Sequence, residues 1–220
     1  MADESRAVIF ANGDLPDPAA LKRQMRPDDL LVAADGGLRH IYSLGLQPHW
    51  LVGDLDSVSV QDVRFLSSAG VRILRFPVDK NETDLELALA AVLAAGYTTI
   101  RVAGATGGRL DQTLGNLFLL QLPDLAGCDI RLEDGREEVF LIRQAAEIRG
   151  TPGDILSLLP LGGPASGIWT RGLKYPLHDE TLWPERTRGV SNVLLETSVH
   201  VQLERGVLIC IHTRNNKPAD

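Results

Sequence analysis

The segment Trp50-Leu51-Val52-Gly53-Asp54-Leu55-Asp56-Ser57 places two carboxylates directly after a short apolar run. If the apolar run is a strand, Asp54 and Asp56 leave its end on the same side, because strand side chains alternate with a period of two. Two carboxylates that face one small volume repel each other, and a bound divalent cation is the simplest way to relieve that repulsion. The alternative is an acidic surface turn in which Asp56 and Ser57 cap the next helix.

Around this segment, from Arg6 to about Ile130, short β-branched runs alternate with patterns typical of helices. Strands are predicted at residues 7–11, 30–34, 50–52, 71–76 and 99–103. Helices are predicted at residues 18–25, 38–44, 60–69 and 83–95. This alternation predicts an α/β domain built on a mostly parallel sheet that is covered on both faces.

Four of the predicted strands end in glycine together with an acid or a hydroxyl. The four segments are Asn12-Gly13-Asp14, Asp35-Gly36-Gly37, Gly53-Asp54-Leu55-Asp56 and Gly104-Ala105-Thr106-Gly107-Gly108-Arg109. The carboxyl ends of parallel strands meet at one edge of a sheet, where ligands of α/β proteins bind. Glycine is common in turns, but four such loops on one edge predict a ligand site in which backbone N–H groups approach phosphate. The sequence contains neither a Walker-type P-loop nor a standard dinucleotide fingerprint.

The segment Asp79-Lys80-Asn81-Glu82-Thr83-Asp84-Leu85-Glu86 opens the most regular predicted helix. Thr83 and Glu86 form a capping box, and Asp84 lies in the first turn, where a negative charge favours the helix dipole. Asp84 can therefore serve the helix alone, or it can be a third metal ligand beside Asp54 and Asp56. Lys80 can reach a phosphate or be solvated.

Arg109, Asp111 and Gln112 follow the last glycine-rich loop and lead into a helix predicted at residues 112–122. Arg109 can brace a phosphoryl group, and Asp111 can accept a proton or orient a hydroxyl. Asp111 is also a plausible N-cap of this helix.

Beyond about residue 145 the helical period disappears, and strand-like runs are punctuated by glycine and proline. Strands are predicted at residues 155–159, 167–170, 193–196, 199–203 and 206–211. This pattern predicts a small antiparallel β-sandwich. We therefore expect an α/β domain over residues 1–145 and a β-sandwich domain over residues 146–220.

Composition excludes several classes of protein. A formal net charge of −7 argues against a nucleic-acid partner or an anionic membrane surface. No apolar run is long enough to span a bilayer, and the amino-terminal residues show no signal peptide. Cys128 and Cys210 indicate neither a zinc site nor a disulfide framework. This fits a reducing compartment, so a cytoplasmic location is expected. The five histidines also show no ligand spacing, and His178 is expected to be solvated in a polar loop over residues 177–188.

The ordered combination of these motifs resembles thiamine pyrophosphokinase. The motifs are Ala34-Asp35-Gly36-Gly37, Gly53-Asp54-Leu55-Asp56-Ser57, Asp79 to Asp84 and Gly104 to Gln112, followed by Gly172-Leu173-Lys174-Tyr175-Pro176-Leu177 and Gly189-Val190-Ser191-Asn192. The resemblance covers nearly the whole chain. It implies a homodimer that transfers a pyrophosphoryl group from ATP to the hydroxyl of thiamine with Mg²⁺, giving thiamine diphosphate and AMP. The implied dimer places the thiamine site between one chain's α/β domain and its partner's sandwich.

The resemblance also implies roles for individual residues. Asp54, Asp56 and Asp84 resemble the Mg²⁺ ligands and, with Arg109 and Asp111, the catalytic set. The implied nucleotide and phosphate contacts are Asn12, Asp35, Gly36, Lys80, Thr106, Gly107, Gly108, Arg109 and Gln112. The implied thiamine contacts are Tyr175, Ser191 and Asn192.

Two other functions are compatible with parts of the sequence. A related diphosphokinase could use another acceptor, such as a pterin alcohol, although the match at Tyr175, Ser191 and Asn192 disfavours it. A non-catalytic nucleotide or thiamine sensor could share the scaffold, although retention of the three acids and Arg109 argues against lost catalysis.

Overall fold

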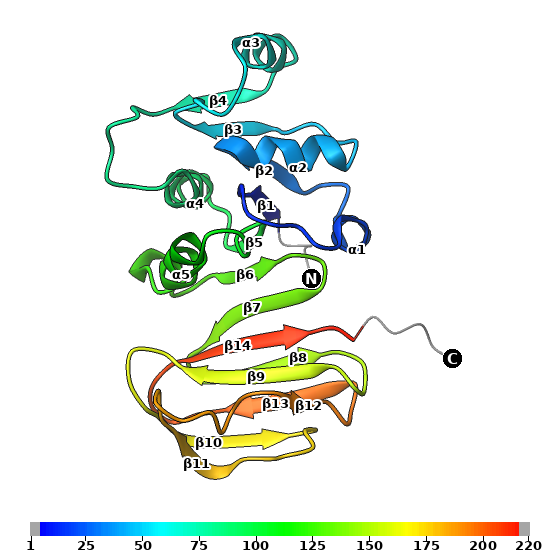
Figure 1. Cartoon of the computed structure of the whole chain (residues 1–220), viewed down its shortest axis with the longest axis vertical. Coiled ribbons are helices and arrows are strands. Elements are labelled where there is room, and N and C mark those ends of the chain that lie inside the picture. Colours follow the sequence, from blue (N-terminus) through cyan, green and yellow to red (C-terminus); the bar gives the residue numbers. More distant parts are fainter. Residues whose placement is uncertain (1–4, 216–220) are drawn as a thin grey trace. The chain divides into compact units, whose positions relative to one another are not determined.

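The computed structural model describes residues 5–215, which divide into two compact units (Figure 1). The N-terminal unit ends at Gly135, and the C-terminal unit begins at Arg136. The boundary expected from the sequence, after residue 145, lies farther along the chain. The difference is strand β7 (Glu137–Ile142), which pairs along its whole length with β14 (Leu208–Thr213) of the C-terminal unit.

The N-terminal unit is built on a parallel sheet, as predicted. Its strands lie in the order β6-β5-β1-β2-β3-β4, and every neighbouring pair among them is parallel. They are β1 (Arg6–Phe10), β2 (Leu30–Ala34), β3 (Trp50–Gly53), β4 (Arg72–Arg75), β5 (Thr99–Ala103) and β6 (Asp129–Glu133). All five residues of β1 are buried, because both faces of this central strand are covered.

Helices cover the two faces of this sheet (Figure 1). They are α1 (Pro18–Gln24), α2 (Leu38–Ser43), α3 (Val60–Ser68), α4 (Asp84–Ala94) and α5 (Leu110–Leu119), with short 3-10 helices η1 (Asp35–Gly37) and η2 (Pro123–Leu125). Leu38, Ile41 and Leu66 pack into one core cluster with Val8 and Phe10 of β1. Within residues 5–215, none of the helices has the length and hydropathy of a membrane-spanning segment.

The helix starts confirm one predicted cap and correct two others. Thr83 caps α4, since its side chain accepts a hydrogen bond from the Glu86 amide. Helix α5 begins at Leu110, so Asp111 lies within the first turn and is not the N-cap. Asp56 and Ser57 do lie in an exposed turn, but Ser59 caps α3, so the expected cap at Asp56 and Ser57 is wrong.

The C-terminal unit contains two antiparallel groups of strands that enclose one apolar core, which confirms the predicted sandwich. One group has the order β12-β9-β14-β7 and the other the order β11-β10-β13-β8. The remaining strands are β8 (Ala145–Arg149), β9 (Ile155–Pro160), β10 (Ala165–Arg171), β11 (His178–Leu182), β12 (Asn192–Val193) and β13 (Ser198–Gln202). Cys210 is fully buried in this core.

Strand β11 corrects the sequence prediction of a polar loop over residues 177–188. Its side chains are mostly polar, but the strand pairs with β10 at the edge of its sheet. His178 packs edge-on against the ring of Trp169, with centroids 5.4 Å apart. The apolar pattern was absent because an edge strand presents much of its surface to water.

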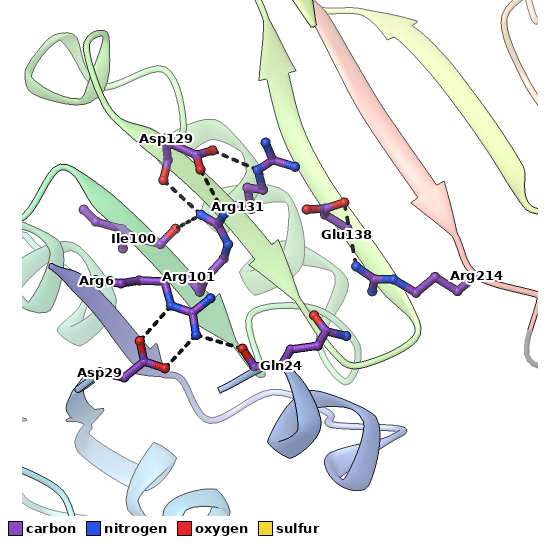
Figure 2. Close-up of polar contacts among 9 residues, drawn as sticks. All are labelled: Arg6, Gln24, Asp29, Ile100, Arg101, Asp129, Arg131, Glu138 and Arg214. Atoms are coloured by element: carbon purple, nitrogen blue, oxygen red, sulfur yellow. Dashed lines mark hydrogen bonds and ion pairs between the residues drawn. The ribbon is translucent and has the colours of Figure 1, made fainter. Parts of the chain in front are cut away.

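Ion pairs fix the amino end of the parallel sheet (Figure 2). Arg6 at the start of β1 donates from Nε and Nη2 to the two carboxylate oxygens of Asp29, at 2.8 and 2.6 Å, and both residues are buried. Arg101 and Arg131 both pair with Asp129 at the start of β6. Figure 2 also shows Arg214 and Glu138, which pair within the C-terminal unit. The bidentate pair between Arg6 and Asp29 fixes the alignment of β1 with the segment that enters β2.

A buried histidine joins three segments of the C-terminal unit. His212 in β14 has no exposed surface, and its Nε2 lies 2.9 Å from Asp154 Oδ2. Its Nδ1 lies 3.7 Å from Glu138 Oε2 in β7. Burial alone lowers the pKa of His212, but Glu138 and Asp154 outweigh burial, and the pKa is raised. The protonated imidazole therefore stabilises this unit.

The first prediction is that the stability of the C-terminal unit depends on the charge of His212. The pKa of an unfolded histidine is about 6.5, so the stabilisation is complete below that pH and is lost as pH rises through the higher folded-state value. The expected contribution is about 1.4 kcal/mol for each unit by which folding raises the pKa. Urea unfolding in a Trp50→Phe background leaves Trp169 and Trp183 as reporters of this unit.

In that assay the difference in unfolding free energy between the parent and His212→Gln should shrink as pH rises. His200→Gln, at an exposed position of β13, is the matched control and should show no such trend. A difference for His212→Gln that is independent of pH contradicts the prediction.

Candidate functional site

The carboxyl ends of the parallel strands surround a cavity of about 580 Å³ in the N-terminal unit. Because loops from four strand ends and the start of α4 line this cavity, residues far apart in sequence meet there. Of the residues predicted for the site, those that line it are Asn12, Asp35, Asp54, Lys80, Asp84, Gly107, Gly108, Arg109 and Gln112. Gly36 lines a neighbouring hollow of about 260 Å³, together with Asn12.

Three carboxylates converge in the cavity, from Asp35 after β2, Asp54 after β3 and Asp84 at the start of α4. One oxygen of each lies within 4.8 Å of the other two. Asp35 is buried, and its Oδ1 has no hydrogen-bond partner. The φ of Asp35 is 43°, a left-handed conformation that is uncommon outside glycine. A buried carboxylate oxygen without a donor is the atom that a cation would coordinate.

The structure does not bring the Asp56 side chain into this group. Strand β3 ends at Gly53, and Leu55 adopts a φ of 67° with its side chain buried. This turn breaks the alternation that was assumed for Asp54 and Asp56, so the carboxylate of Asp56 is exposed and accepts a hydrogen bond from Ser57 Oγ. The Asp56 amide instead donates to Asp54 Oδ1 at 3.1 Å. A metal-binding role for Asp56 stays a prediction.

Lys80 lies among the acids. Its Nζ donates to Asp84 Oδ1 at 2.7 Å and to Asp54 Oδ2 at 3.2 Å. Partial burial lowers the pKa of Lys80, but the two acids outweigh that effect, and the pKa is raised. The Asp56 amide lowers the pKa of Asp54, and Lys80 lowers it further. Three ionised carboxylates and one ammonium leave a net charge of −2, which matches the charge of one divalent cation.

Close backbone packing holds the glycine-rich loop after β5. A Cβ on Gly13 would lie 2.5 Å from the carbonyl oxygen of Thr106, so glycine is needed where these two loops meet. The Thr106 carbonyl accepts from the Asp14 amide at 2.9 Å, and Asp14 Oδ2 accepts from the Gly108 amide at 3.0 Å. The structure thus gives Thr106 a backbone contact that shapes the loop, while Gly107 and Gly108 face the cavity.

Arg109 and Asp111 form an exposed ion pair at the start of α5. The Arg109 Nη2 to Asp111 Oδ2 distance is 2.5 Å, and the side chains are 74% and 64% exposed. Arg109 also lines the cavity, and water surrounds most of its side chain. The hydrogen bond from Arg109 lowers the pKa of Asp111, which makes this carboxylate a weaker proton acceptor.

Two residues of α2 support the site although the sequence did not indicate them. His40 Nε2 lies 2.9 Å from the Gly13 carbonyl oxygen, and Arg39 Nη2 donates to the carbonyls of Asn12 and Gly13. A carbonyl only accepts, so His40 Nε2 carries a proton, and burial lowers the pKa of the ring, which favours its neutral form. No local pattern could have identified contacts that span more than 25 residues of chain.

The three residues predicted to contact thiamine lie together in the C-terminal unit. Asn192 is buried, its Oδ1 accepts from the Tyr175 amide at 3.0 Å, and its Nδ2 donates to the Tyr175 carbonyl at 2.7 Å. Asn192 therefore fixes the backbone of Tyr175, a residue that is 51% exposed. Ser191 has a φ of 58°, and its amide donates to Ser157 Oγ.

Comparison with known proteins identifies the family. Residues 21–132 match the family described as thiamin pyrophosphokinase, catalytic domain, and residues 142–208 match thiamin pyrophosphokinase, vitamin B1 binding domain. Thiamine pyrophosphokinase of Bacillus subtilis is 27% identical over 194 residues, which cover 84% of this chain and 87% of that protein.

Solved structures agree with this match. The crystal structure of the B. subtilis thiamine pyrophosphokinase superposes with a TM-score of 0.85 at 26% identity and covers 96% of this chain and 100% of that chain. A thiamin pyrophosphokinase family protein from Enterococcus faecalis superposes with a TM-score of 0.80 at 26% identity, over 96% and 100% of the two chains. The chain belongs to the thiamin pyrophosphokinase family, whose members are transferases that convert thiamine to thiamine diphosphate with ATP.

Proposed function

We propose that this protein transfers the pyrophosphoryl group of ATP to the hydroxyl of thiamine and releases AMP. The observation that carries the proposal is the group of Asp35, Asp54 and Asp84 beside the glycine-rich loop, with a net charge of −2 after pairing with Lys80. Transfer of a phosphoryl-type group depends chiefly on alignment and charge neutralisation, and these residues can supply both.

The residues present fit Mg²⁺, which prefers carboxylate oxygens and keeps part of its water shell. Asp35, Asp54 and Asp84 would hold the ion, and Asp56 on the same loop as Asp54 remains a candidate ligand. When bound, Mg²⁺ would neutralise and orient the triphosphate. The unpartnered Asp35 Oδ1 supports this assignment, because a bound cation would satisfy it.

The remaining cavity residues would position the nucleotide. Gly107 and Gly108 allow the phosphates to approach the backbone closely, and Arg109 would brace the charge that develops on the transferred group. Asn12 and Gln112 both line the cavity, and their side-chain amides can hydrogen-bond the nucleotide. Asp111, or one of the metal-bound aspartates, would accept the proton of the thiamine hydroxyl.

Tyr175 would stack against thiamine, which carries a positive charge on its thiazolium ring. The Nζ of Lys174 lies 5.5 Å from the centroid of the Tyr175 ring, so the face of this ring already attracts a cation. Because Asn192 holds the backbone of Tyr175 from both sides, the ring is presented on a fixed segment.

We also propose that the protein is a homodimer. Helix α5 has no buried residue, yet Leu110, Leu114 and Phe118 recur at the spacing of one helix face and are 72%, 42% and 53% exposed. An exposed apolar stripe of this kind marks an interaction surface, and the family resemblance makes a second copy of this chain the occupant.

The second prediction concerns the acids. Asp54→Asn and Asp84→Asn should each lower the rate of AMP release from ATP, Mg²⁺ and thiamine by about 100-fold or more, because charge that balances the metal is removed. The thermal midpoint should change little, since each change also removes repulsion between carboxylates. Asp56→Asn should lose activity similarly if Asp56 is a ligand.

Asp28→Asn, at an exposed acid outside the cavity, is the control and should keep normal turnover. Near-normal activity in Asp54→Asn or Asp84→Asn would exclude the proposed metal role. Normal AMP release with a pterin alcohol, and none with thiamine, would show that the acceptor is a pterin alcohol and not thiamine.

The third prediction concerns assembly. Replacing both Leu114 and Phe118 with glutamate should shift the protein from dimer to monomer in sedimentation velocity, because charges cannot be buried unpaired at an apolar interface. Phe65→Glu, at a 56% exposed position of α3, is the matched control and should remain dimeric. Wild-type protein that sediments as a monomer would refute the homodimer.

A further inference from the structure

The ammonium of Lys80 occupies the position of a cation between two carboxylates. Its Nζ contacts Asp84 Oδ1 at 2.7 Å and Asp54 Oδ2 at 3.2 Å, and the Lys80 side chain is only 11% exposed. The side chains of Asp54 and Asp84 are 13% and 27% exposed, so water screens these contacts incompletely. Lys80 is therefore the main counter-charge of the acid group in the protein without ligands.

These contacts also use the oxygens that a metal would need. Asp54 Oδ2 and Asp84 Oδ1 accept from Lys80, and Asp54 Oδ1 accepts from the Asp56 amide. Both oxygens of Asp54 are thus engaged, whereas Asp35 Oδ1 has no partner. A divalent cation bound among these three acids would lie close to the ammonium, and the two positive charges would repel each other.

We propose that Lys80 is an exchangeable internal cation, which holds Asp54 and Asp84 together until a divalent ion replaces it and then pairs with the phosphates of the nucleotide. This inference rests on the function proposed above. Lys80 lies in the segment between β4 and α4, outside any helix or strand, and lines the same cavity as Gly107, Gly108 and Arg109. Its four-carbon side chain can turn from the acids toward a phosphate in that cavity.

The exchange couples metal binding to nucleotide binding. A metal ion that binds alone must displace Lys80 without giving the ammonium a new partner, so its affinity is low. A triphosphate accepts the displaced ammonium, so nucleotide and metal strengthen each other's binding by the same factor. Lys80 is therefore a positioning residue, because it makes the site bind the metal ion and the nucleotide together in preference to the metal ion alone.

The fourth prediction tests this exchange with Mn²⁺ as the probe. Free Mn²⁺ is counted by electron paramagnetic resonance during titration of wild type and Lys80→Met, each with and without a non-hydrolysable ATP analogue. Lys80→Met should bind Mn²⁺ alone roughly tenfold more tightly than wild type, and the enhancement of Mn²⁺ affinity by the nucleotide should fall by a similar factor. Lys80→Arg, which keeps the charge, should retain the weak affinity for Mn²⁺ alone.

Lys22→Met is the matched control, because it removes the same charge from α1, where Lys22 Nζ donates to the Leu44 carbonyl. It should titrate as wild type. The inference is overturned if Lys80→Met binds Mn²⁺ alone no more tightly than Lys22→Met, or does not bind it. It is also overturned if Lys80→Met is unfolded with and without Mn²⁺, whereas recovery of the fold on adding Mn²⁺ supports it.

The titration separates this inference from the proposed function. If wild type releases no AMP from ATP and thiamine, the transfer reaction is refuted, whereas the Mn²⁺ affinities still report on Lys80. If turnover is normal and the Mn²⁺ affinities of the two methionine variants are equal, only the role of Lys80 is refuted.

Discussion

Repulsion among three carboxylates is the constraint on which the N-terminal unit depends. Asp35, Asp54 and Asp84 have oxygens within 4.8 Å of one another, and two like charges about 4 Å apart near a protein surface repel by about 4 kcal/mol. Lys80 offsets part of this energy and leaves two negative charges uncompensated. Such a group persists only because each of the three acids is attached to a different rigid element, which prevents the carboxylates from moving away from one another. The same rigidity makes the group ready for a cation, since little reorganisation is required on binding.

The two ends of the parallel sheet divide the tasks of stability and binding. At the amino end, Arg6 and Asp29 form a buried bidentate pair that holds β1 against the segment entering β2 (Figure 2). At the carboxyl end, the loops after β1 and β5 are held by backbone contacts such as Asp14 to Thr106, which leave side chains and glycine surfaces turned to the cavity. Charges are therefore paired at the amino end of the sheet and in excess at the carboxyl end. This distribution is consistent with a fold in which ligands bind at the carboxyl ends of the strands.

The sequence was sufficient for the fold where its signals are local. The apolar runs predicted β1, β2, β3 and β5, and the Thr83 and Glu86 pair predicted the start of α4. It was insufficient where tertiary contacts decide. Strand β11 was missed because its edge position permits polar side chains, and His40 was missed because its partner, Gly13, is distant in the chain. In the site, the period-two alternation of strand side chains predicted that Asp54 faces a group of acids, and the structure places it in one. The alternation did not predict that the chain turns at Leu55 and directs Asp56 outward, because β3 already ends at Gly53.

Asp35 is the acid of this group whose conformation and burial are least favourable for stability. Its left-handed backbone costs about 1–3 kcal/mol, and a buried oxygen without a partner costs about as much again. An asparagine would tolerate the same backbone conformation and would not add a third negative charge to the group, so stability alone would favour the amide. A carboxylate at this position is favourable only if something positive completes the group, and Lys80 reaches Asp54 and Asp84 but leaves Asp35 Oδ1 unpartnered. The proposed metal site would relieve this cost, because a cation held by Asp35, Asp54 and Asp84 would lie nearer to Asp35 Oδ1 than Lys80 does.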